Sequence, residues 1–211
     1  MTGRGTLGTR APLIGIIGPI GSGKSTVAAR LAARGAVVVD ADLLTRELMA
    51  PGTPITAAII GRFGEEFRGR DGALDRAALG RLVFSDPARL EELEAIVHPA
   101  VGELGRRTIL AADATDPVAI VIEAVKLVEA GQAVWCDEVW LVICDPSAQL
   151  ERLRGRGMSE RDARQRIAAQ AASLPIWRKA ATRTLSTDGS LDDVYDAVDA
   201  LLKEVRSGHL S

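Results

Sequence analysis

The sequence has 211 residues, of which 47% are hydrophobic and 26% are charged, and its formal net charge is -2 at pH 7. These values are typical of a globular protein with one substantial core, and the small net charge argues against a nucleic-acid partner. No apolar run approaches the ~18 residues of a transmembrane helix, so we expect no membrane partner. Residues 1–12 lack the apolar segment of a signal peptide and predict a flexible N-terminal tail on a cytoplasmic protein. The two cysteines, Cys136 and Cys144, are expected to be small buried apolar residues rather than metal ligands or a disulfide.

A glycine-rich loop follows the first predicted strand. The apolar run 13–17 predicts a buried strand, residues 18–25 read GPIGSGKS, and residues 26–34 predict a helix. This is the GxxxxGK[ST] phosphate-binding pattern in its proper context, because glycines let several N–H groups face one anion and a helix N-terminus attracts it. Lys24 is expected to reach the β- and γ-phosphates, and Ser25 to hold Mg²⁺. The predicted nucleotide-binding residues are Gly18, Gly21, Ser22, Gly23, Lys24, Ser25 and Thr26.

Further apolar segments predict four more strands. They are residues 36–39, 118–122, 139–144 and, more weakly, 184–186, and helical segments separate them. This alternation predicts an α/β fold of the P-loop NTPase type, with a five-stranded parallel sheet between two helical layers. In such a sheet the ligand binds beyond the carboxyl ends of the strands.

Two carboxylates end the second predicted strand. Asp40 and Asp42 precede a helix, so helix capping is one function open to both, and Asp40 is expected to be the more structural. Asp42 is expected to face the phosphate loop and either accept a proton from an acceptor hydroxyl or hold a Mg²⁺-bound water. Both roles stay open from the sequence.

Residues 51–112 contain no convincing strand and predict a helical lobe inserted between the second and third strands. Asp86 and Pro87 have the order of an N-cap followed by the first residue of a helix. The pair His98 and Pro99 is expected to break or kink the next helix. A lobe inserted at this point of the sheet predicts a binding site for a second substrate.

Residues 147–172 predict a second helical excursion, a hairpin of segments 147–155 and 159–172. Small phosphotransferases close such a lid over ATP, and lid arginines stabilise charge on the transferred phosphoryl group. Arg152 and Arg156 are four residues apart and share one face if the helix extends that far. The alternative is a solvated charged surface.

The remaining residues form the predicted nucleotide-binding core, in segments 13–50, 113–146 and 173–206. Within the last segment, residues 190–205 carry apolar side chains at helical spacing and predict a helix that packs on the core. Residues 206–211 are expected to fray.

Several motifs occur in the order of one known family, and the chain from about residue 13 to 205 resembles the dephospho-CoA kinases. The motifs are Gly18–Thr26, Asp40–Asp42, Arg62–Gly64, Asp71–Arg76, Leu79–Phe84, Leu93–Pro99, Gln149–Leu153 with Arg156, and Arg166–Gln170.

This resemblance implies transfer of a phosphoryl group from ATP, with Mg²⁺, to the ribose 3′-hydroxyl of dephospho-CoA, which gives CoA and ADP in the last step of CoA synthesis. It implies that residues 51–112 bind the CoA moiety. It implies Asp42, Lys24 and Arg152 as catalytic residues, Ser25 and Asp42 at the metal, and Arg156 at ATP. Arg76 and His98 would contact the substrate. Alternatively, His98 is a structural histidine, and Arg76 pairs with a neighbouring aspartate.

The chain departs from the family pattern after the third strand, where residues 125–129 read VKLVE instead of PLLFE. Lys126 is either a solvated helical residue paired with Glu129 or, as our hypothesis, a contact to a substrate phosphate. Thr187 replaces a usual asparagine, and Pro19 replaces a common glycine in the loop.

Two other functions remain open from the sequence. One is a different small P-loop kinase, for a nucleoside, a nucleotide or a sugar acid. The other is a non-catalytic nucleotide sensor. For each of them, and for the dephospho-CoA kinase, we expect small-molecule ligands and a monomer or small homo-oligomer.

Overall fold

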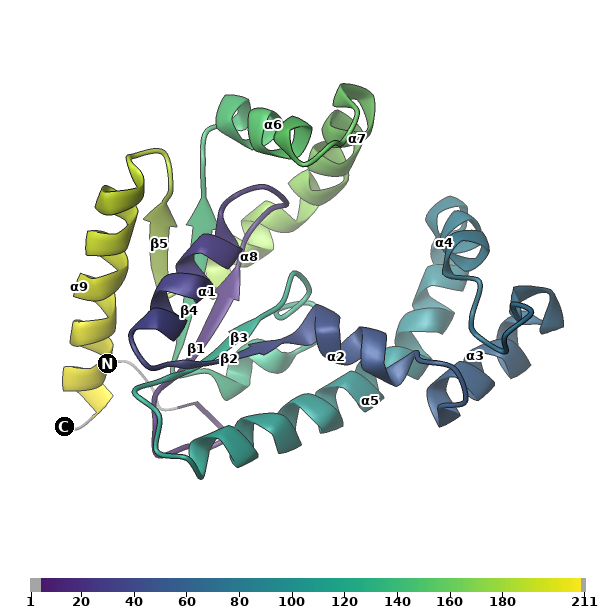
Figure 1. Cartoon of the computed structure of the whole chain (residues 1–211), viewed down its shortest axis with the longest axis horizontal. Helices are drawn as coiled ribbons and strands as arrows, with labels where there is room; N and C mark the ends of the chain where they lie inside the picture. The colour runs from purple at the N-terminus through teal and green to yellow at the C-terminus, as the bar shows by residue number, and fades with distance from the viewer. Residues whose placement is uncertain (1–4, 210–211) are drawn as a thin grey trace. The chain divides into compact units, whose positions relative to one another are not determined.

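The computed structural model describes residues 5–209 and contains one five-stranded sheet in the order β2-β3-β1-β4-β5 (Figure 1). β1 pairs in parallel with β3 and with β4, and β4 pairs in parallel with β5. The α/β class and all five predicted strands are confirmed, with their ends shifted by no more than two residues. The strands are β1 (Leu13–Ile17), β2 (Val37–Asp40), β3 (Ile120–Glu123), β4 (Glu138–Ile143) and β5 (Arg183–Ser186).

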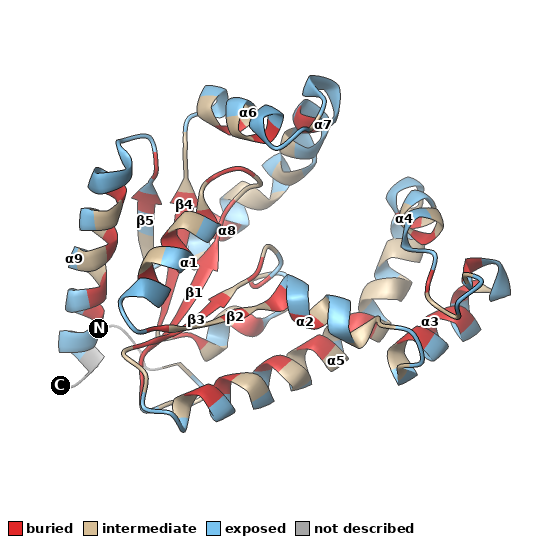
Figure 2. Cartoon of the chain, viewed as in Figure 1, coloured by how far each residue is buried: buried red, intermediate tan, exposed pale blue. Residues whose placement is uncertain are grey.

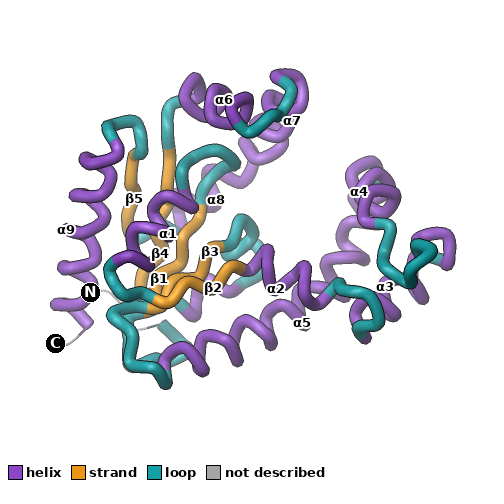
Figure 3. Tube along the Cα trace, in the orientation of Figure 1, coloured by secondary structure: helices purple, strands orange, loops and turns teal. Residues whose placement is uncertain are grey.

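Helices account for most of the remaining described residues (Figure 3). Within the described residues, the chain divides into two compact units: one comprises the segments up to Val39 and from Ile109 onward, and the other is Asp40–Thr108. We call them the core unit and the helical unit. The α-helices are α1 (Lys24–Ala33), α2 (Ala41–Leu48), α3 (Pro54–Phe63), α4 (Arg76–Ser85), α5 (Pro87–Asp113), α6 (Pro146–Gly155), α7 (Glu160–Gln170), α8 (Leu174–Ala180) and α9 (Leu191–His209).

In the core unit, α1 and α9 pack together on one face of the sheet. Leu31 of α1 and Val198 of α9 are fully buried in one apolar cluster with Ile16 and Trp140 of the strands. Figure 2 shows the buried residues of α9 along one side of the helix, as its apolar spacing predicts. Of the described residues, no helix is both long and apolar enough to cross a membrane.

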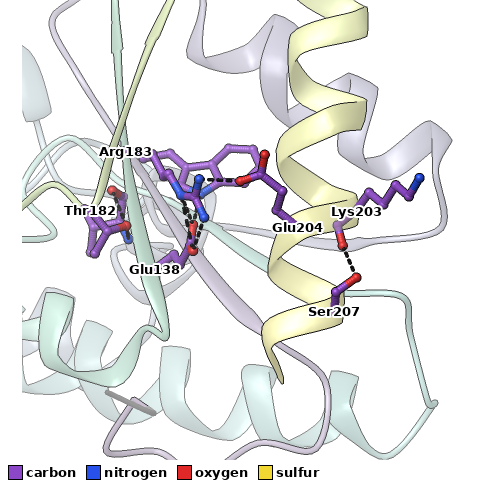
Figure 4. Close-up of polar contacts among 8 residues, drawn as sticks. Glu138, Thr182, Arg183, Lys203, Glu204 and Ser207 are labelled. Atoms are coloured by element: carbon purple, nitrogen blue, oxygen red, sulfur yellow. Dashed lines mark hydrogen bonds and ion pairs between the residues drawn. The ribbon is translucent and has the colours of Figure 1, made fainter. Parts of the chain in front are cut away.

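A buried carboxylate of β4 and an arginine of β5 together link the sheet to α9 (Figure 4). Glu138 is 4% exposed. It accepts hydrogen bonds from Trp140 Nε1 at 2.8 Å and from Arg183 Nη2 of β5 at 3.1 Å. Arg183 Nη1 also donates to Glu204 of α9 at 2.6 Å. The buried charge is thus paired and hydrogen-bonded, as burial of a carboxylate requires.

The helical unit has its own apolar core, in which Ile59, Phe63, Leu79 and Val97 are buried. Asp86 caps α5 as predicted, since its Oδ1 accepts from the backbone N–H of Ala88 at 3.0 Å.

Of the break or kink predicted at His98 and Pro99, the break is wrong, because α5 continues through Pro99 to Asp113. Val97 and Val101, on either side of Pro99, are both buried in the apolar core of the helical unit. We infer that this packing outweighs the hydrogen bond that proline removes.

The predictions of a flexible N-terminal tail and of a frayed C-terminus both need correction. Of the expected flexible tail 1–12, residues 1–4 lie outside the described residues, whereas the rest is held by carboxylates distant in sequence. Asp137 Oδ1 accepts from Gly5 N at 2.8 Å, and Asp113 Oδ1 accepts from Ala11 N at 2.9 Å. At the other end, α9 extends to His209 instead of fraying from residue 206, and residues 210 and 211 lie outside the description.

Candidate functional site

The glycine-rich loop leaves β1 through backbone conformations that suit glycine. Gly18 has φ 145°, and a Cβ at this position would lie 2.2 Å from the carbonyl oxygen of Val142. Gly23 has φ 97°, and its Cβ would lie 3.1 Å from Thr187 Cγ2. Larger residues at these positions would displace the loop from β4 and from Thr187, so the glycines fix its close approach to the sheet.

α1 begins directly after this loop, at Lys24, and no side chain caps its N-terminus. No side chain therefore competes with an anion at this helix end, although Thr26 N already donates to Gly23 O at 3.0 Å. Lys24 is 9% exposed, and its Nζ donates to the carbonyl oxygens of Gly18 at 2.9 Å and of Pro19 at 3.1 Å. Ser25 is exposed in the first helical turn, whereas Ser22 is fully buried and its N–H donates to Pro19 O at 3.2 Å.

Arg152 of α6 reaches back to the phosphate loop and to the segment after β5. Its Nη1 donates to Thr187 Oγ1 at 2.8 Å, and its Nη2 donates to the carbonyl oxygen of Thr187 at 2.6 Å. A longer bond of 3.4 Å joins Nη1 to Gly21 O. Thr187 is 3% exposed and donates its hydroxyl proton to Ser22 O at 2.7 Å. Thr187 is not among the site residues predicted from the sequence, where its departure from the family asparagine was the available signal.

Arg156 lies in a different setting from Arg152. α6 ends at Gly155, and Arg156 is the exposed C-cap residue directly after it. Because the helix does not include Arg156, the condition for the two arginines to share one helical face is not met. The second lid helix begins as predicted, because Ser159 Oγ accepts from Asp162 N at 3.1 Å and caps α7.

Two groups near Arg152 have pKa values shifted in opposite directions, for different reasons. The Ser186 hydroxyl, the backbone N–H of Asp145 and the charge of Arg152 lower the pKa of the Asp188 carboxyl. Burial raises the pKa of the Cys144 thiol, whose Sγ donates to Gly21 O at 3.7 Å. Burial also raises the pKa of the Cys136 thiol, to about 12. Both cysteines are free; Cys136 is buried as expected, whereas Cys144 is only half-buried.

The segment after β3 forms turns, so the predicted helical setting of Lys126 is wrong. Lys126 is exposed. Glu129 Oε1 accepts from Trp177 Nε1 of α8 at 2.9 Å. Leu127 is fully buried against Gly15, where a Cβ would lie 2.5 Å from Leu127 Cδ2. Turns place Leu127 in the core and Lys126 at the surface.

The remaining predicted residues belong to the helical unit. Asp40 caps α2, since its Oδ1 accepts from Asp42 N at 2.8 Å and from Leu43 N at 3.0 Å. Asp42 is exposed in the first turn of the same helix. Arg76 Nη2 donates to the carbonyl oxygen of Arg46 at 3.1 Å.

His98 is half-buried on α5.

The structure brings Lys24, Arg152 and Thr187 together in the core unit. It places Asp42, Arg76 and His98 on helices of the other unit. Within the described range 5–209, no cluster of three or more His, Cys, Asp or Glu side chains is suited to hold a metal ion.

Comparison with known proteins places these features in one family. The family model for dephospho-CoA kinase matches residues 12–193. A dephospho-CoA kinase from Geobacter metallireducens is 42% identical over 195 residues, which cover 91% of this chain and 96% of that relative.

Two solved structures are also similar. A crystal structure from Thermus thermophilus has a TM-score of 0.77 and 37% identity, and the match covers 92% of this chain and 97% of that one. Dephospho-CoA kinase from Campylobacter jejuni shares the fold, with a TM-score of 0.69, 19% identity, and coverage of 93% of this chain and 98% of that one. With its phosphate loop and the family match over most of its length, the chain belongs to the dephospho-CoA kinase family.

Proposed function

We propose that the protein transfers the γ-phosphoryl group of ATP to the ribose 3′-hydroxyl of dephospho-CoA and releases CoA and ADP. The observation that carries the proposal is the glycine-rich loop before the uncapped N-terminus of α1, in a chain of this family. A bond forms between the 3′-oxygen and the γ-phosphorus, the bond from that phosphorus to ADP breaks, and the hydroxyl proton goes to a base.

The nucleotide end of the reaction is assigned to the phosphate loop. Its backbone N–H groups and the start of α1 hold the phosphates, with contributions from Gly18, Gly21, Ser22, Gly23 and Thr26. Lys24 exchanges the carbonyl oxygens of Gly18 and Pro19 for phosphate oxygens. This exchange brings a positive charge to the β- and γ-phosphates.

The exposed hydroxyl of Ser25, at the helix N-terminus, fits a Mg²⁺ ion that takes most of its ligands from phosphates and water. Bound there, the ion supplies charge neutralisation. Asp42 is the proposed holder of a water bound to this ion, as the alternative to the proton-accepting role given below.

Arg152 is the proposed electrostatic catalyst on the lid. Its guanidinium already lies against the phosphate loop, where Thr187 and Gly21 fix its plane. A planar guanidinium with several donors suits the oxygens of a phosphoryl group in transfer. Arg156, exposed at the end of α6, is proposed as a second phosphate contact on ATP.

On the acceptor side we propose that Asp42 takes the proton of the 3′-hydroxyl. It is exposed, and Asp40 carries the capping role that would otherwise occupy it. Arg76, His98 and Lys126 are proposed contacts to dephospho-CoA, with the lobe 51–112 as the CoA-binding part and residues 147–172 as the lid.

No observation on the described residues favours another kinase acceptor or a sensing role. We propose the cytoplasm as the compartment, in keeping with an ATP-consuming reaction and two free thiols, and a monomer or small homo-oligomer as the assembly.

The test is an ADP-release assay with Mg-ATP and dephospho-CoA, beside adenosine, AMP and gluconate, with mass detection of the product. A product one phosphoryl group heavier, with the phosphate on the ribose 3′-oxygen, supports the proposal. Turnover of one of the other acceptors alone, or ATP binding without transfer, overturns it.

A further inference from the structure

Both backbone groups of Ile20, in the middle of the phosphate loop, are hydrogen-bonded by glutamine side chains from the lid helices. Gln149 Nε2 of α6 donates to Ile20 O at 2.6 Å. Gln170 Oε1, at the end of α7, accepts from Ile20 N at 2.7 Å. We call Gln149 and Gln170 the Ile20 clamp.

The clamp has the features of a built contact. Gln149 is 5% exposed, so its amide is withdrawn from water and its bond to Ile20 is not exchanged for solvent. The two bonds come from separate helices and run in opposite directions, with Gln149 as donor and Gln170 as acceptor. Together they fix the position and the orientation of the backbone N–H and C=O groups of Ile20.

The clamp acts next to groups assigned to ATP. The residue after Ile20 is Gly21, whose carbonyl oxygen also receives the 3.4 Å bond from Arg152. A loop held in one conformation before the nucleotide arrives loses less conformational freedom when it binds. α6 and α7 are thereby joined to the loop beside Gly21.

We propose that Gln149 and Gln170 are positioning residues that hold the phosphate loop in its nucleotide-receiving conformation and couple it to the lid helices. The inference rests on the proposed function only in that it takes the loop to bind ATP. Neither glutamine is assigned to the chemical step, so the clamp acts on nucleotide affinity and leaves the rate of transfer at saturating ATP nearly unchanged.

The experiment compares the same isosteric change at the two positions. In Gln170→Glu the carboxylate still accepts from Ile20 N–H, whereas in Gln149→Glu it cannot donate to Ile20 O and two oxygens face each other. Both variants add one negative charge beside the loop, but position 149 is more buried, so their difference also includes the cost of burying that charge. The neutral variants Gln149→Met and Gln170→Met each remove one bond without adding charge.

The readouts are the Kd for the non-hydrolysable analogue Mg-AMP-PNP by calorimetry, the KM for ATP, kcat, and the melting temperature. We expect Gln149→Glu to bind the analogue about tenfold more weakly than Gln170→Glu, and each methionine variant to bind about five- to tenfold more weakly than the wild type. Values of kcat at saturating ATP should stay within about twofold of the wild type.

Equal Kd values for the two glutamate variants, or methionine variants that bind like the wild type, overturn the proposal. Should Gln149→Glu not fold, Gln170→Met on the less buried side of the clamp decides the question. Analogue binding needs no acceptor, so the two proposals can fail separately. If the variants show these Kd differences but the wild type does not phosphorylate dephospho-CoA, the proposed function is wrong and the clamp stands.

Discussion

The hydroxyl of Thr187 accepts a hydrogen bond from Arg152 Nη1 at 2.8 Å while donating to the carbonyl oxygen of Ser22 at 2.7 Å. One buried side chain thus connects the lid arginine to the phosphate loop. We expect Thr187→Val, which keeps the shape and removes the hydroxyl, to raise the KM for ATP and to destabilise the protein by about 1–3 kcal/mol, because Ser22 O loses its partner.

Thr187→Ser is the matched control, since it keeps the hydroxyl and removes only a methyl group. Steady-state kinetics and urea unfolding of both variants provide the check. If the valine and serine variants have the same KM for ATP, the hydroxyl does not position the loop or Arg152.

Asp42→Asn should lower kcat by about 10²- to 10⁴-fold, because an amide cannot take the proton of the acceptor hydroxyl. The Kd for AMP-PNP should stay near the wild-type value. Asp40→Asn makes the same change two residues earlier, where asparagine caps a helix about as well as aspartate, and is expected to be nearly silent. Turnover near the wild-type level in the Asp42 variant would remove it from the mechanism.

Lys126→Ala should raise the KM for dephospho-CoA about tenfold while the KM for ATP stays unchanged, since the proposed contact is a charged one to the acceptor phosphate. The exposed Lys179 of α8 offers a control for the loss of one surface charge. Measuring both KM values in Lys126→Ala and Lys179→Ala separates the two effects. An unchanged acceptor KM in the first variant rejects the contact.

Glu138→Ala should destabilise the protein by about 3–5 kcal/mol, because the variant leaves Arg183 and the indole N–H of Trp140 without their buried partner. Glu204 also pairs with Arg183, but its side chain is 58% exposed, so Glu204→Ala should cost less than about 1 kcal/mol. Urea unfolding at pH 7 measures both values. Equal losses would show that burial does not set the strength of this network.

Asp199 makes stability depend on acidity. Hydrogen bonds from Arg34 and Arg30 lower the pKa of its carboxyl in the folded protein, whereas the unfolded chain has the ordinary value of about 3.9. These contacts therefore stabilise the fold fully above about pH 4, and the stabilisation is lost as the pH falls further towards the folded pKa.

The difference in unfolding free energy between wild type and Asp199→Asn should accordingly be largest near pH 7 and shrink below about pH 4. Asp196→Asn, on the exposed face of the same helix, has the same charge change as a control. A difference that stays constant from pH 7 to pH 3 contradicts this linkage.

The sequence predicted the parts of the fold that depend on local pattern. β1 and the loop after it follow from an apolar run and a fixed glycine spacing, and the predicted first strand has the observed bounds. The passage of α5 through Pro99 depends on packing within the helical unit, which local propensity does not contain.

The residues of the site divide in the same way, into those recognisable from local pattern and those that depend on the fold. Lys24 and Ser25 belong to a contiguous motif and are recognisable from it. Thr187 and Gln170 meet the loop across more than a hundred residues of chain, so their contacts could be found only once the fold was known. Gly5 and Asp137 pair over a similar separation, which is why residues 5–12 were wrongly expected to be loose.

The state of the two cysteines has a consequence for a protein that handles CoA compounds. Dephospho-CoA and CoA both end in a thiol, and exchange with disulfides requires a thiolate as the attacking group. Burial raises the pKa of the Cys136 thiol to about 12, and partial burial raises the pKa of the Cys144 thiol, so both favour the protonated form. The chain therefore resists mixed-disulfide formation with oxidised forms of its own substrate and product, and its stocks should keep their mass in the presence of CoA disulfide.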